Sequence, residues 1–66
     1  MNKKQAGEID RRIERVYGAT CAGIQIDIFD ISKVFVHARG VIASGADDAA
    51  LGVAIREFVE TIRVPA

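Results

Sequence analysis

Five side chains in the central part of the chain have the chemistry to bind a ligand. They lie at every second or fourth position of the stretch IQIDIFDISKVFVHARGVIASG, residues 24–45, and are Phe29, Lys33, Phe35, His37 and Arg39. Aromatic rings can stack on the bases of single-stranded nucleic acid, at about 1–3 kcal/mol per base, while cations contact the phosphates. The rings of Phe29 and Phe35 could instead fill a dimer interface or pack under a neighbouring helix, with Lys33, His37 and Arg39 as a solvated rim. We favour this second interpretation over nucleic-acid binding.

A second group of cations lies near the N-terminus. Lys4, Arg11 and Arg15 would share one side of a helix and could follow a phosphate backbone. Glu8 interrupts this basic helix face, and its spacing to Arg12 favours an ion pair within the helix. The nine Lys and Arg residues are balanced by nine Asp and Glu residues, so the chain lacks the basic excess of a typical nucleic-acid-binding domain. Nucleic acid is therefore an alternative partner and not the favoured one.

The sequence offers little for catalysis or for a metal. A structural zinc ion needs three or four protein ligands, and Cys21 and His37 are the single cysteine and the single histidine of the chain. His37 and Asp27 could approach each other diagonally on a strand face, which would be half of an acid–base pair. No nucleophile completes that pair. We predict no catalytic residues, no metal, no cofactor and no enzymatic activity.

These side chains must be positioned by the surrounding elements, of which the first is a helix. From Gln5 to Tyr17 the apolar residues recur at helical spacing, and charged residues fill the rest of each turn. The apolar residues are Ala6, Ile9, Ile13, Val16 and Tyr17. Gly18 follows directly and is typical of a residue that ends a helix.

The middle of the chain has the alternating pattern of two strands. Residues 22–29 place Ile24, Ile26 and Ile28 on one side, and residues 33–43 place Val34, Val36, Ala38 and Ile42 on one side. A three-residue loop at residues 30–32 would set Ile28 opposite Val34 and keep the apolar faces together, and a five-residue loop would keep the same pairs. The five candidate binding residues would then lie on or beside the outer face of an antiparallel hairpin.

A second helix is predicted to start at the capping-box pattern that Ser44 begins and Asp47 ends, with Asp47 and Asp48 in its first turn. Between Ala50 and Ile62 its inner stripe is Leu51, Ala54, Ile55, Phe58 and Ile62. Val53 falls opposite this stripe. The predicted fold class is α+β, with the order helix, strand, strand, helix and both helices on one face of the hairpin. Residues 1–66 would form a single α+β domain.

The length of the chain favours self-association. A chain of 66 residues buries only about 60% of the surface that it exposes when unfolded, and a two-stranded sheet is marginal alone. We therefore expect a homodimer that completes the sheet by pairing edge strands. The polar N-terminus and the lack of a long apolar stretch predict a soluble cytoplasmic protein that does not enter a membrane.

Together these patterns predict a small non-enzymatic homodimeric interaction or assembly module. The alternative is a nucleic-acid-binding protein that uses the outer sheet face and the basic first helix.

Overall fold

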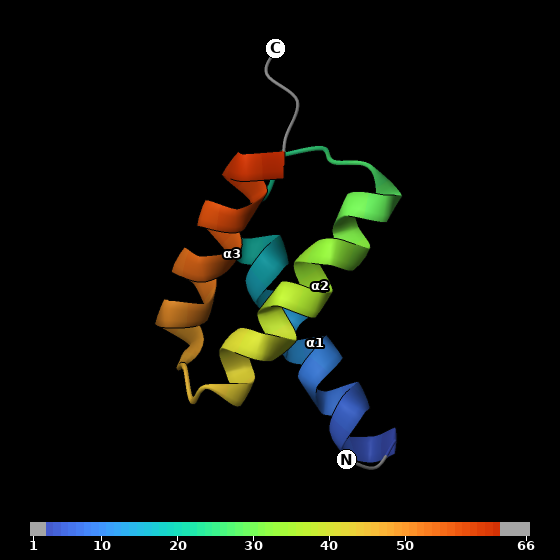
Figure 1. Cartoon of the computed structure of the whole chain (residues 1–66), viewed down its shortest axis with the longest axis vertical. Coiled ribbons are helices and arrows are strands. Elements are labelled where there is room, and N and C mark those ends of the chain that lie inside the picture. Colours follow the sequence, from blue (N-terminus) through green and yellow to red (C-terminus); the bar gives the residue numbers. More distant parts are fainter. Residues whose placement is uncertain (1–2, 63–66) are drawn as a thin grey trace.

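The computed structural model describes residues 3–62, and it contains three helices. They are α1 (Lys3–Thr20), α2 (Ile28–Ala43) and α3 (Asp48–Ile62). In Figure 1, α2 and α3 lie side by side and α1 crosses behind them. The described residues contain no strand. The predicted α+β fold with an antiparallel hairpin is therefore wrong, and the fold is all-α.

Helix α2 occupies most of the segment that was predicted to be the hairpin. Its N-cap is Asp27, whose side chain accepts a hydrogen bond of 2.8 Å from the backbone N–H of Phe29. Asp30 lies in the first turn, where the helix dipole favours negative charge. The buried residues Val34 and Ala38 are one turn apart. The segment thus contains the N-cap of a helix and a buried stripe at helical spacing, although its apolar residues also alternate.

The turns differ from the predicted ones. Gly18 lies inside α1, which continues to Thr20, and the left-handed glycine after the helix is Gly23, with a φ of 83°. Between α2 and α3 the Ser44 hydroxyl donates to the Val41 carbonyl and Gly45 adopts a φ of 94°. The N-cap of α3 is Asp47 rather than Ser44, because the Asp47 carboxylate accepts from the backbone N–H of Ala50 at 2.8 Å.

The core is shared by all three helices. Its fully or nearly buried members are Ile13, Val16, Cys21, Val34, Ala38, Leu51, Ile55 and Val59. Val59, which is not a member of the predicted inner stripe, is completely buried, while Val53, opposite that stripe, is exposed. Gly52 permits α1 and α3 to approach, because a Cβ atom there would lie 3.1 Å from the Thr20 hydroxyl oxygen.

Ion pairs connect α1 to each of the other two helices. Asp48 at the start of α3 accepts from Arg12 Nε at 2.6 Å and from Arg15 Nη2 at 2.7 Å. The hydrogen bond from Arg12, together with the charges of both guanidinium groups, lowers the pKa of Asp48 below its ordinary value. Arg39 of α2 contacts both carboxylate oxygens of Asp10 in α1, at 3.0 and 3.1 Å. No helix within residues 3–62 is both long enough and apolar enough to span a membrane.

Candidate functional site

The five candidate binding residues do not share one surface. Phe29, Lys33 and His37 follow each other at four-residue spacing on α2 and are exposed. Phe35 packs against the core. Arg39 is turned toward α1, where it pairs with Asp10. The outer sheet face that would have united all five is not formed by the described residues.

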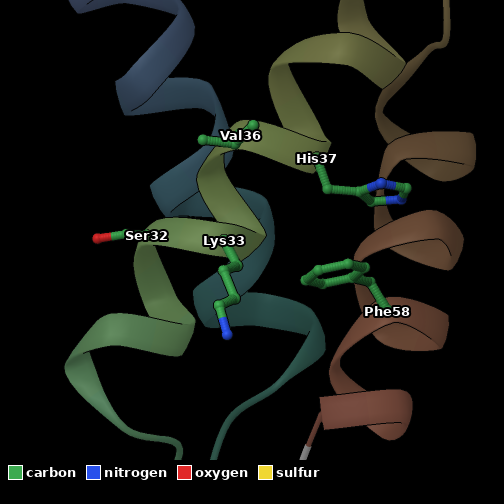
Figure 2. A pocket seen from close by; sticks show the side chains of 5 residues that line it. All are labelled: Ser32, Lys33, Val36, His37 and Phe58. Atoms are coloured by element: carbon green, nitrogen blue, oxygen red, sulfur yellow. The ribbon is translucent and has the colours of Figure 1, made fainter.

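His37 has a partner that the sequence pattern did not indicate. Its ring stacks on that of Phe58 in α3, with centroids 4.6 Å apart and an interplanar angle of 12°. Figure 2 shows the two rings pointing toward each other from α2 and α3. The spacing of the apolar residues predicts Phe58 in the inner stripe of its helix, and it is only partly buried. The predicted diagonal approach of His37 to Asp27 depended on a strand, so it is wrong.

A shallow hollow of about 450 Å³ lies beside this ring pair. It is lined by Ser32, Lys33, Val36, His37 and Phe58 (Figure 2). The Lys33 ammonium group lies 3.4 Å from the Asp30 carboxylate, three residues earlier. The lining of the hollow therefore combines an apolar side chain, two stacked rings and a cation.

Large apolar side chains continue from the hollow along α2. Ile28, Phe29 and Val36 are 73%, 76% and 65% exposed. Phe29 and Val36 are seven residues apart, which is two helical turns, so they lie on one side of the helix. The three side chains present on the order of 400 Å² of apolar surface, comparable with the largest patch on a typical monomer.

We refer to this surface as the α2 outer face. It consists of Ile28, Phe29, Ser32, Lys33, Val36 and His37, together with Phe58 across the hollow.

The predicted basic helix face is present on α1 but is partly engaged. Lys4, Arg11 and Arg15 are all exposed, as a shared helix side requires. Arg15 donates to Asp48 at 2.7 Å, and Arg12 donates to Asp48 instead of pairing with Glu8. On α2, Lys33 and Arg39 also have carboxylate partners. A phosphate would have to compete with these carboxylates for three of the cations that the sequence offers.

Cys21 is buried just beyond the end of α1. Its side chain is 3% exposed, and burial raises the pKa of its thiol, which disfavours the reactive thiolate. The nearby Tyr17 also has a raised pKa, because of its own burial and then of the Cys21 charge. Within residues 3–62 no group of three or more His, Cys, Asp and Glu side chains is placed to hold a metal ion.

Comparison with known proteins finds no match to a family model, to a curated protein or to a solved structure. The α2 outer face is therefore interpreted from its own residues.

Proposed function

We propose that this chain is a non-enzymatic, cytoplasmic interaction module that works as a homodimer, and that the α2 outer face is its binding surface. One observation supports the proposal above the others. Helix α2 buries Val34 and Ala38 in the core and, on its other side, exposes Ile28, Phe29 and Val36. A helix that is apolar on opposite sides is normally covered on both.

The exposed area is that of a small interface. The three apolar side chains of each chain would bury on the order of 400 Å² of apolar surface, and burial of apolar surface favours association. Buried area does not by itself set the affinity, because association also costs translational freedom and side-chain ordering. We therefore expect a dimer that dissociates on dilution.

Nucleic-acid binding stays a prediction from the sequence, and we do not propose it. The surface that it would use is divided between two sides of α2, and Arg39 is held by Asp10. Phe35, one of its two rings, packs against the core and is only partly exposed.

The proposal is tested by measuring molecular mass by light scattering over a dilution series. We expect two chains at high concentration and one after dilution. Val36→Glu should be a folded monomer at every concentration, because it places a charge in the centre of the α2 outer face. Val53→Glu is the matched control, since Val53 is similarly exposed, at 59% against 65%, but lies on α3. Circular dichroism would verify that both variants remain helical.

A mass of one chain for the unaltered protein at all concentrations would contradict the proposal. So would equal weakening of the dimer by Val36→Glu and Val53→Glu.

A further inference from the structure

We infer that two copies of this chain pair antiparallel along α2, with the two-fold axis beside Ser32, so that Phe29 of each copy enters the hollow of the other. This inference rests on the proposed homodimer and adds its geometry. The α2 outer face of each copy then supplies both the inserted Phe29 ring and the hollow that receives the ring of the other copy.

The residues on either side of Ser32 match in kind. Around a two-fold axis each residue meets the residue that lies equally far on the other side of the axis. In the stretch DIFDISKVFVH, residues 27–37, this pairing sets Ile28 opposite Val36. Both lie one turn from Ser32 on its side of the helix, so apolar side chains meet apolar ones. Ser32 at the centre is small, which lets two helices approach closely.

The hollow lies where antiparallel pairing needs it. Phe29 precedes Ser32 by three residues and Val36 follows it by four, so Phe29 of one copy is brought beside Val36 of the second copy. Val36 lines the hollow together with the stacked rings of His37 and Phe58. A third ring at their edge would extend the aromatic contact in the offset or edge-to-face arrangements that such rings prefer. All three exposed apolar side chains of α2 are covered in this arrangement.

Charge is also complementary about the axis. Asp27 and Asp30 lie before Ser32, whereas Lys33 and His37 lie after it. Antiparallel pairing brings the acidic part of each helix beside the basic part of the other. Parallel pairing in register would instead set like charges opposite each other.

The area places this interface at the small end of the range for specific association. Stable complexes bury about 1,200–2,000 Å² in total, and smaller interfaces are transient. Two copies of the α2 outer face approach the lower limit when the contributions of Ser32, Lys33 and the ring pair are added to those of the three apolar side chains. A dimer that forms at high concentration and dissociates on dilution is the expected behaviour.

Disulfide cross-linking under mild oxidation tests the geometry. Ser32→Cys should form a covalent dimer by itself, because residues on the axis of an antiparallel pair face each other. Ile28→Cys and Val36→Cys should cross-link weakly alone and several-fold more strongly when mixed, giving a product whose mass is that of one chain of each. Val53→Cys, exposed on α3, is the matched control, and the unaltered chain shows the background from the buried Cys21. Light scattering on the same samples before oxidation gives the mass.

The outcomes separate the geometry from the dimer itself. The inference would be overturned, and the homodimer retained, if light scattering gave a mass of two chains but the cross-linking yield of Ser32→Cys did not exceed that of Val53→Cys. Stronger linking of Ile28→Cys to itself than to Val36→Cys would indicate parallel pairing and would also overturn it. A mass of one chain under all conditions would remove both the inference and the proposed function.

Discussion

Helices α1 and α2 bury one side each in the same core, but their outer sides have opposite character. The outer side of α1 carries exposed charged residues such as Lys4, Arg11 and Arg15, and its apolar stripe is narrow. The outer side of α2 carries Phe29 and Val36, which are 76% and 65% exposed. A charged outer side suits contact with water, whereas an apolar one gains free energy when it is covered. The difference supports the proposal that α2, and not α1, contacts a partner.

The largest expected effect on stability comes from comparing a buried residue of α1 with an exposed residue of α2. Ile13 of α1 is completely buried, so Ile13→Ala should lower the free energy of unfolding by about 2–5 kcal/mol, enough to unfold much of so small a chain. Val36→Ala should change it by about 0.5 kcal/mol or less at a concentration where the chain is a monomer. Thermal denaturation followed by circular dichroism measures both. Equal losses would mean that Val36 is covered within a single chain, and the comparison would fail.

The next effect concerns the start of α2. Asp27→Ala removes the side chain that accepts from the Phe29 N–H, and it should lower the free energy of unfolding by about 0.5–2 kcal/mol. Asp27→Asn keeps a capping oxygen and should retain most of the stability. Urea denaturation of the three proteins gives the values. No loss in Asp27→Ala would indicate that α2 does not begin at this cap.

Replacing a glycine inside α1 or α2 should have a smaller effect on stability, and it tests which of the two helices forms the dimer contact. A Cβ atom at Gly7 in α1 or at Gly40 in α2 meets nothing within 4 Å. Each change to alanine should therefore stabilise the single chain by about 0.5–1 kcal/mol, because alanine favours the helix. We expect no effect of Gly7→Ala on the dimer mass measured by light scattering. Weakening of the dimer by Gly7→Ala would place the contact on α1 and reverse the comparison.

The smallest effect is the pH dependence of the contact between α1 and α3. Because the pKa of Asp48 is lowered in the folded chain, its ion pairs stabilise the fold above the pKa of the unfolded carboxyl, about 3.9. This contribution is lost as the pH falls through the lower folded pKa. Asp48→Asn should reduce stability near neutral pH and flatten the decline in acid, as measured by melting temperature between neutral pH and pH of about 2. If the melting temperature of Asp48→Asn fell in acid as steeply as that of the unaltered chain, Asp48 would not contribute to the loss of stability.

The spacing of apolar residues was sufficient to predict α1 and α3 but not α2. In α1 the positions between the apolar residues are charged, so only a helical period fits. In α2 the apolar residues Val34, Val36 and Ala38 also alternate, and the β-branched residues among them favour strands when taken alone. The helical signal was Asp27 followed by Asp30, an N-cap and a first-turn acid. Because α2 is apolar on two opposite sides, the helical spacing of its apolar residues is hard to recognise in the sequence.

The candidate site was predictable where strand and helix spacing coincide. Phe29, Lys33 and His37 were placed together on the outer face of the predicted hairpin, and their four-residue spacing also places them on one side of a helix. Phe35 and Arg39 share that side only in a strand, and in the helix they turn toward the core and α1. The contact of His37 with Phe58 required the packing of α2 on α3. No local pattern in the sequence specifies that packing.

The most direct test of self-association through the α2 outer face is an amide chemical-shift dilution series of the isotopically labelled protein. We expect concentration-dependent shifts at Phe29, Lys33 and Val36, with little change at Val53 on α3. Shifts centred on Val53, or none over the concentration range in which light scattering detects two chains, would contradict the account.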